Sequence, residues 1–142
     1  MPSFKKCFNI RSRDFIHAGE ASIAVQQLLK QMHVDSNLIR RIAICGYEGE
    51  MNVVMHGGDG LFCVEIDKNK IVLNISDDGQ GIKDIAKVME KGFSTATDEY
   101  REMGFGAGMG LPNMEKNADN MIIESENENG TTVQMTFFTK SA

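Results

Sequence analysis

The residues best suited to chemistry stand where an apolar run ends in acidic residues and glycines. The run Ile71–Ser76 alternates like a strand and is followed by Asp77, Gly79 and Gly81. Alternate residues of a strand share one face, so Asp77 lies on the same face as the apolar residues before it. A carboxylate on the core side is costly without a hydrogen-bonding partner. We therefore expect a bound polar ligand beside Asp77.

Three polar residues with helical spacing form a second candidate group. Glu48, Asn52 and His56 recur at every fourth position, so they lie along one side of a helix, one turn apart. We expect His56 to be a structural residue near the helix end. Glu48 and Asn52 are candidates for the wall of a pocket.

A glycine-rich segment, Gly104–Leu111, follows, with glycine at every second position as far as Gly110. It closes a stretch, Gly92–Gly110, that has little periodic apolar content, and irregular stretches of this length are usually functional lids. Together with Asp77, the pattern indicates a nucleotide pocket with a movable cover. A dinucleotide-binding loop is excluded because no strand precedes Gly104 and Met109 stands where G-x-G-x-x-G needs its last glycine. No Gly-Lys-Ser/Thr follows, which excludes a Walker A loop.

The elements that must position these residues follow from periodicity, caps and turn residues. We predict the order β-α-α-β-β-α-lid-α-β-β, and hence an α+β sandwich in which helices cover one face of a mixed, largely antiparallel sheet. The predicted strands are Phe4–Ile10, Gly60–Ile66, Ile71–Asp78, Asn120–Glu126 and Thr131–Phe138. The predicted helices run from Asp14 to about Met32, from Asp35 or Ser36 to Gly57, over Asp84–Lys91 and over Leu111–Ala118.

Two glycines inside the second helix need an explanation. Gly46 and Gly49 stand mid-helix, where each costs up to about 1 kcal/mol relative to alanine. We expect close approach of another backbone, or of a ligand, at these positions.

Composition narrows the class of protein. The chain has 142 residues, which fits a single domain over residues 1–142, and its net charge of -5 argues against binding to nucleic acid through phosphates. The three cysteines, Cys7, Cys45 and Cys63, have no C-x-x-C spacing, so we expect free buried thiols. No signal peptide and no apolar run long enough for a membrane helix is visible. We expect a cytoplasmic protein that contacts neither membrane nor nucleic acid.

Three separated motifs resemble those of the Bergerat-fold (GHKL) ATPases, the group that contains histidine-kinase catalytic domains, heat-shock protein 90, gyrase B and MutL. The spacing Glu48-x-x-x-Asn52 with His56-Gly57 resembles the N box. Asp77-x-Gly79-x-Gly81-Ile82 resembles the G1 box. Gly106-x-Gly108-Met109-Gly110-Leu111, with Gly130-Thr131-Thr132 behind it, resembles the G2 region and its trailing threonine. Within the group the chain looks most like anti-sigma serine kinases and switch kinases.

The resemblance implies a binding site for Mg-ATP, and the residue types can fill its roles. Asp77 can accept a hydrogen bond from the exocyclic amine of adenine, where guanine offers an oxygen, and Thr131 can add a hydroxyl. The glycines let the backbone approach the ligand. Asn52 offers a neutral oxygen to a Mg²⁺ that takes its other ligands from phosphates and water. The helix that begins after Gly110 offers free N–H groups to the phosphates.

Glu48 is the expected general base, which would take the proton of an attacking serine hydroxyl or of water. The alternative is that Glu48 is a solvated residue on the helix surface with no part in catalysis. Arg101 is a candidate contact of the γ-phosphate or, equally, a solvated lid charge. The lid is acidic around Arg101, where a phosphate cover is expected to be basic, and this departs from the family pattern.

The resemblance implies a protein-serine kinase that phosphorylates a STAS-type antagonist protein, binds a sigma factor, and forms a homodimer. The alternative is a binding module, an anti-sigma or signalling adaptor, whose nucleotide state selects its partner without phosphoryl transfer. A third possibility is a detached histidine-kinase catalytic domain. The absence of a helix pair with a phospho-acceptor histidine counts against it.

Overall fold

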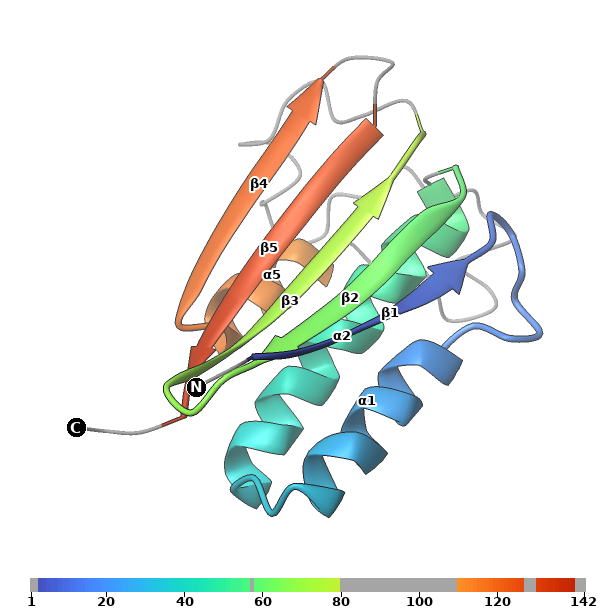
Figure 1. The fold of residues 1–142 in the computed structure, drawn as a ribbon. Helices are drawn as coiled ribbons and strands as arrows, with labels where there is room; N and C mark the ends of the chain where they lie inside the picture. The colour runs from blue at the N-terminus through green and yellow to red at the C-terminus, as the bar shows by residue number, and fades with distance from the viewer. Residues whose placement is uncertain (1–2, 57, 80–109, 127–129, 140–142) are drawn as a thin grey trace.

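A single five-stranded sheet organises the part of the chain that the computed structural model describes, residues 3–56, 58–79, 110–126 and 130–139. The strand order is β1-β2-β3-β5-β4, and every pairing is antiparallel. The helices lie on one face of the sheet (Figure 1), which confirms the predicted α+β sandwich. The strands are β1 (Phe4–Ile10), β2 (Gly60–Ile66), β3 (Lys70–Asp77), β4 (Asn120–Glu126) and β5 (Gly130–Phe138); the helices are α1 (Glu20–Gln31), α2 (Ser36–His56) and α5 (Gly110–Asn117). The predicted helix Asp84–Lys91 lies outside the described residues.

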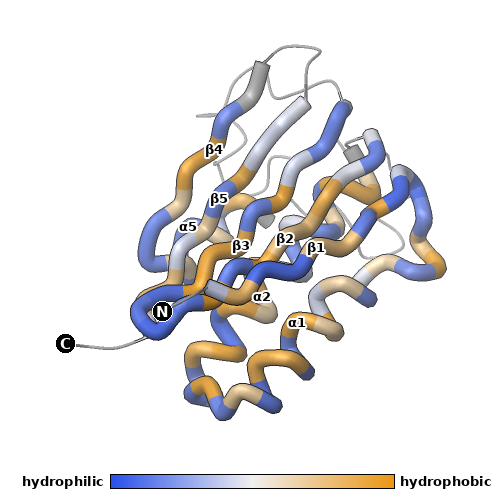
Figure 2. Tube along the Cα trace, viewed as in Figure 1, coloured by the Kyte–Doolittle hydropathy of each residue, from blue (hydrophilic) through white to orange (hydrophobic). Residues whose placement is uncertain are grey.

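The core lies between the sheet and the helices because alternate strand residues point to the same face. Figure 2 shows hydrophobic stretches along the strands and along α1 and α2, interrupted by hydrophilic residues. Alternate residues of the two central strands are buried, as predicted: Ile71, Leu73 and Ile75 in β3, and Val133, Met135 and Phe137 in β5. None of the described helices is both long and apolar enough to span a membrane.

Helix α2 lies closely against the sheet at its two interior glycines. A Cβ atom added at Gly46 would stand 3.1 Å from Cζ of Phe62 in β2, and one added at Gly49 would collide with Ile75 in β3. The predicted close approach of a backbone or a ligand is wrong for the described residues, because side chains, chiefly those of Phe62 and Ile75 in the sheet, lie over these glycines.

The start of α1 differs from the prediction. Asp14 does not cap it, because the Asp14 carboxylate pairs with Nδ1 of His17 at 2.9 Å and the helix begins at Glu20. The cap comes from the neighbouring helix instead. Glu50 of α2, only 3% exposed, accepts hydrogen bonds from N–H of Gly19 at 2.9 Å and from N–H and Oγ of Ser22 at 3.0 and 2.8 Å.

Helix α5 is fixed to α2 at its C-terminal end. Nε of Arg41 donates to the carbonyl oxygen of Asn117 at 2.8 Å, and Nη2 of Arg41 pairs with the Asp119 carboxylate at 2.9 Å. A cation beside the last carbonyls of a helix satisfies them and interacts favourably with the helix dipole. Arg41 therefore holds α5 in place beside α2.

The cysteine prediction is wrong for two of the three residues. Cys7 of β1 and Cys63 of β2 form a disulfide across a sequence separation of 56. Sequence spacing did not indicate it because only the strand register brings the two residues opposite each other. Cys45 is a free buried thiol, as predicted; burial raises its pKa to about 12, and Sγ donates to the carbonyl oxygen of Met114 at 3.5 Å.

Candidate nucleotide-binding site

The structure brings Asp77 and Thr131 together at one end of the sheet. Asp77 ends β3, Thr131 is the second residue of β5, and the two are directly opposite in the antiparallel register. Both lie on the core face, since Ile75 precedes Asp77 there and Val133 follows Thr131. Thr131 is 9% exposed and Asp77 is half-buried. The two residues predicted to bind adenine are therefore neighbours on adjacent strands.

The Asp77 carboxylate is held by backbone groups. Oδ1 accepts a hydrogen bond from N–H of Gly79 at 2.9 Å. Burial raises the pKa of Asp77, the adjacent Asp78 raises it further, and the N–H groups of Gly79 and Thr131 oppose the rise. A half-buried carboxylate whose described donors are backbone N–H groups can accept another donor, such as an exocyclic amine.

Gly130 allows β5 to begin close to Asp77. Its φ is +92°, which L side chains rarely adopt, and an added Cβ would collide with the carbonyl oxygen of Asp77. A side chain at this position would therefore push β5 away from the end of β3. Gly130 thus sets the approach of Thr131 to Asp77.

Helix α2 brings Asn52 to the same end of the sheet. Val53, the next residue, packs against Gly60, since an added Cβ there would stand 2.7 Å from Cγ1 of Val53. Gly60 in turn pairs with Asp77 in the β2–β3 register. Asn52 is half-buried and lies at the level of Asp77 along the sheet.

Glu48, one turn earlier, is half-buried and accepts a hydrogen bond from the side chain of Asn113 in α5. Burial raises its pKa, and the bond from Asn113 lowers it in part. A carboxylate with a raised pKa takes up a proton more readily at neutral pH than an ordinary glutamate does. The geometry is compatible with a general base and argues against a fully solvated residue.

The contact between Glu48 and Asn113 also locates the first turn of α5. Asn113 is the fourth residue of this helix, which begins at Gly110. The first N–H groups of a helix have no partner within the helix, and its positive end attracts anions. The side chain of Leu111 is buried in the core, so only its backbone could serve a phosphate. The N-terminus of α5 thus lies beside Glu48.

Two residues that the sequence analysis missed support this arrangement. Asn113 holds Glu48, and Glu50 ties α2 to the start of α1 through buried hydrogen bonds. Glu50 lies between the two N-box residues in sequence, but the helix turns its side chain toward α1. The signal in the sequence is a charged residue at a helix position that faces the apolar core, where charged side chains are rare unless they are paired.

The remaining predicted site residues lie outside the described part of the chain. They are Gly81, Ile82, Arg101, Gly106, Gly108 and Met109. The predicted lid is therefore still a prediction.

The described residues fit a magnesium ion that is bound mainly by the nucleotide. The described part of the chain holds no group of three or more His, Cys, Asp or Glu side chains that could hold a metal. Mg²⁺ at nucleotide sites takes one or two protein oxygens and completes its shell with phosphates and water. The amide oxygen of Asn52, a half-buried residue, can supply one such ligand, and Glu48 lies one turn away.

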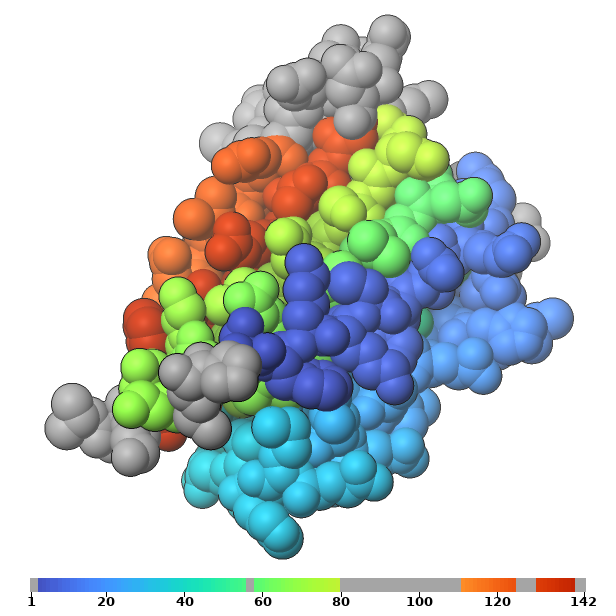
Figure 3. Space-filling model, in the orientation of Figure 1, coloured from blue at the N-terminus to red at the C-terminus, as the bar shows by residue number. Residues whose placement is uncertain are grey.

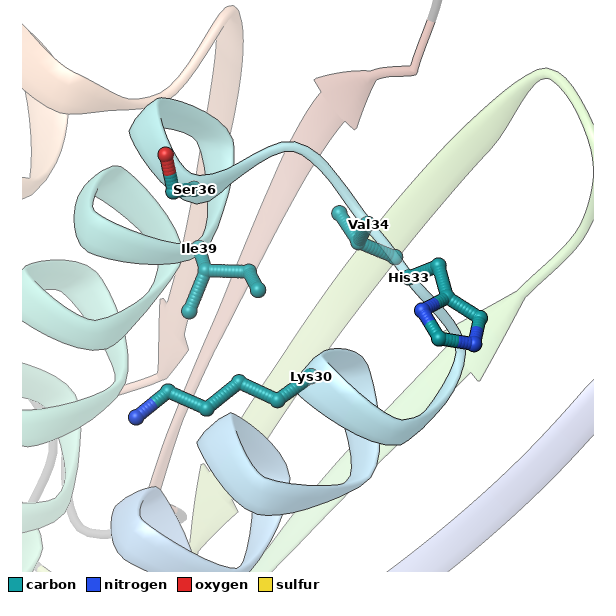
Figure 4. Close-up of a pocket in the computed structure, with 5 residues that line it drawn as sticks. All are labelled: Lys30, His33, Val34, Ser36 and Ile39. Carbon is teal, nitrogen blue, oxygen red and sulfur yellow. The ribbon is translucent and has the colours of Figure 1, made fainter.

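A hollow elsewhere on the surface does not contribute to this site. It has a volume of about 380 Å³ and lies where α1 joins α2, far along α2 from Asn52. It is wide open to solvent. In Figure 4, Lys30 extends below Ile39, and the His33 ring points away from Ser36. The start of α2 is already capped, since Asp35 accepts hydrogen bonds from N–H of Asn37 and Leu38.

Comparison with known proteins defines the class to which this fold and site belong. Residues 24–141 match the family model described as histidine kinase-, DNA gyrase B-, and HSP90-like ATPase. The match spans most of the chain and includes Glu48, Asn52, Asp77 and Thr131 of the candidate site. The chain belongs to this ATPase family.

Within that family, the chain is similar to anti-sigma F factors. It is 32% identical over 121 residues to an anti-sigma F factor of Clostridium botulinum (strain Alaska E43 / Type E3), which covers 81% of each chain. It is 36% identical over 94 residues to the anti-sigma F factor of Thermoanaerobacter sp. (strain X514), covering 63% of this chain and 62% of that protein.

Solved structures share the fold at low identity. The RsbU and RsbW domains of Rv1364c from Mycobacterium tuberculosis match with a TM-score of 0.58 and 17% identity, over 96% of this chain and 34% of that one. The mycobacterial sensor histidine kinase MprB matches with a TM-score of 0.55 and 13% identity, over 96% of this chain and 99% of that one.

Proposed function

We propose that this protein binds Mg-ATP and transfers the γ-phosphate to a serine of a STAS-type antagonist protein, as an anti-sigma-factor kinase. The observation that carries the proposal is the meeting of two groups at one end of the sheet. Asp77 and Thr131 are paired at the end of β3 and the start of β5, and α2, which carries Glu48 and Asn52, packs through Val53 on Gly60, the β2 partner of Asp77. The similarity to anti-sigma F factors supports the choice of partner class.

The residues divide into two functional parts in this proposal. Asp77 accepts a hydrogen bond from the adenine amine, and Thr131 contributes its hydroxyl to the same base. Asn52 and the start of α5 serve the magnesium and the phosphates. When bound, the magnesium neutralises phosphate charge, which phosphoryl transfer requires.

Glu48 provides the acid–base chemistry. Its carboxylate takes the proton of the serine hydroxyl as that oxygen attacks the γ-phosphorus and the bond to the β-phosphate oxygen breaks. Asn113 orients the carboxylate through the hydrogen bond described above. Because burial raises the pKa of Glu48, we expect the transfer rate to fall as the pH is lowered through that pKa.

The contact between Glu48 and Asn113 also favours a second candidate function. If the bond serves only to join α2 to α5, the protein is a nucleotide-dependent binding module without phosphoryl transfer. Transfer by the wild type distinguishes the two functions, since the second predicts none. Under the first function, Glu48→Gln should then abolish transfer and keep nucleotide and partner binding, whereas under the second it should leave both kinds of binding unchanged.

The first experiment is a thermal-shift and calorimetric titration with Mg-ATP, Mg-ADP and Mg-GTP. A ligand that binds only the native state raises its apparent stability. We expect stabilisation by the adenine nucleotides and not by Mg-GTP. Transfer is then assayed with γ-labelled ATP and purified STAS-type proteins from the same source. Absence of stabilisation by any nucleotide would refute the proposal.

Three further parts of the proposal concern the cell and the assembly. We propose a cytoplasmic protein, a homodimer, and a single ATP-binding domain over residues 1–142. Light scattering coupled to size-exclusion chromatography tests the dimer, since a monomeric mass at working concentration would exclude it.

A further inference from the structure

The disulfide between Cys7 and Cys63 joins two neighbouring strands of the sheet, β1 and β2. The two residues are directly opposite in the β1–β2 register, with their Cα atoms 4.0 Å apart. Cys63 stands between Phe62 and Val64, which are fully buried under the helices. Because successive strand residues point to opposite faces, the disulfide lies on the face of the sheet that the described helices leave uncovered.

That position makes the disulfide accessible. Cys7 is exposed and Cys63 is half-buried, and β1 and β2 lie side by side at the surface in Figure 3. The third cysteine provides a contrast within the same chain. Cys45 is fully buried, and burial raises its pKa to about 12, so its thiolate is scarce at neutral pH.

We propose that Cys7 and Cys63 form a reversible thiol–disulfide modification site, which reacts with low-molecular-weight thiols and their disulfides. A thiolate RS⁻ attacks one sulfur, the Cys7–Cys63 bond breaks, and a mixed disulfide forms while the other cysteine leaves as a thiolate. A second RS⁻ attacks the mixed disulfide, which releases the second cysteine and RSSR. Two electrons pass from the two thiols to the protein, and both cysteine thiolates take up protons from water. Oxidation is the reverse reaction.

Exposure and compartment both favour reversibility over a permanent cross-link. Exposed disulfides are reached by thiolates without unfolding and belong to the labile class. Disulfides in a reducing compartment are usually transient, and the proposed cytoplasmic location is of this kind. The reaction itself does not depend on the nucleotide site, so the two proposals can fail separately.

The modification site controls the attachment of the edge strand. Among the described strands, β1 pairs only with β2. The disulfide is therefore a covalent tie at the edge of the sheet. Within the described part of the chain, reduction leaves β1 held by its hydrogen bonds to β2 and by the packing of Phe8 and Ile10, so we expect β1 to open more often than the central strands β3 and β5 do.

The test uses the full chain in folded form. The protein is equilibrated in buffers of reduced and oxidised dithiothreitol, trapped with maleimide, and mapped by peptide mass spectrometry. Hydrogen exchange is measured on each form. We expect reduction in native buffer at a rate within about tenfold of that in urea, full reoxidation, and amide exchange in β1 about tenfold or more faster in the reduced form with β3 and β5 unchanged.

Cysteine variants show which of the three cysteines carries the redox response. Cys45→Ser should keep the whole response, and the Cys7→Ser/Cys63→Ser double variant should match the reduced wild type in both redox buffers. If the double variant does not fold, the reduced wild type supplies the same comparison. Failure of Cys7 and Cys63 to join in oxidising buffer would overturn the proposal. So would reduction that proceeds only when the whole protein unfolds, or equal β1 exchange in the two forms.

Discussion

Asp77→Asn is the substitution that tests the adenine assignment most directly. It keeps the size of the side chain and an oxygen for the Gly79 N–H, and it removes the charge. A hydrogen bond to a charged group contributes about 1.5–3 kcal/mol, and each 1.4 kcal/mol is a factor of about ten in affinity. We therefore expect Mg-ATP affinity to fall by more than about tenfold, and by as much as about a hundredfold.

Calorimetric titration of Mg-ATP into both proteins measures the loss. Asp78→Asn is the matched control, because Asp78 is the adjacent carboxylate and is exposed; it should retain wild-type affinity. The asparagine side chain introduced by Asp77→Asn can donate its amide N–H to the oxygen that guanine has in place of the amine, so Mg-GTP, which the wild type should not bind, should gain affinity while Mg-ATP loses it. Wild-type affinity for Mg-ATP in Asp77→Asn would refute the assignment.

The same substitution should have the opposite effect on stability. Burial raises the pKa of Asp77 in the folded state, so this group contributes stability at low pH that is lost as the pH rises through the folded pKa. The asparagine variant avoids that loss. Urea unfolding across this pH range should show the variant gaining on the wild type as the pH rises. A gap that narrows with rising pH would contradict the electrostatic account.

Three further substitutions test the helices around the site. Glu48→Gln should abolish phosphoryl transfer and keep Mg-ATP affinity within about threefold by calorimetry, since Glu48 is assigned to the chemical step; retained transfer would exclude it as the base. Glu50→Ala should lower the free energy of unfolding in urea by about 2–4 kcal/mol, because it leaves the N–H groups at the buried start of α1 without their acceptor. The control is Glu20→Ala, since Glu20 is exposed in the first turn of α1, and it should change the free energy of unfolding by under about 0.5 kcal/mol. Gly49→Ala gains about 1 kcal/mol of helix propensity but collides with Ile75, so a net loss of about 1–3 kcal/mol is expected, and a gain would show that Ile75 can move.

Local pattern was enough to predict the sheet and the faces of its strands. Alternation with a period of two identified the buried residues of β3 and β5, and it placed Asp77 and Thr131 on the core face, as the structure has them. In the same way, the four-residue spacing of Glu48 and Asn52 was enough to predict that both lie on one side of a helix. These features depend on neighbours within one element, so their signal is contiguous in the sequence.

Tertiary structure decided the contacts between elements. The local capping pattern favoured Asp14 as the cap of α1, but Glu50 from another helix takes that role. Nothing near Cys7 indicates that its partner is Cys63, because the pairing depends on the register of β1 on β2. The sequence by itself therefore indicated which residues are candidates for binding a nucleotide. Only the packing of α2 and α5 on the sheet decided what holds them, since those contacts join residues far apart in the chain.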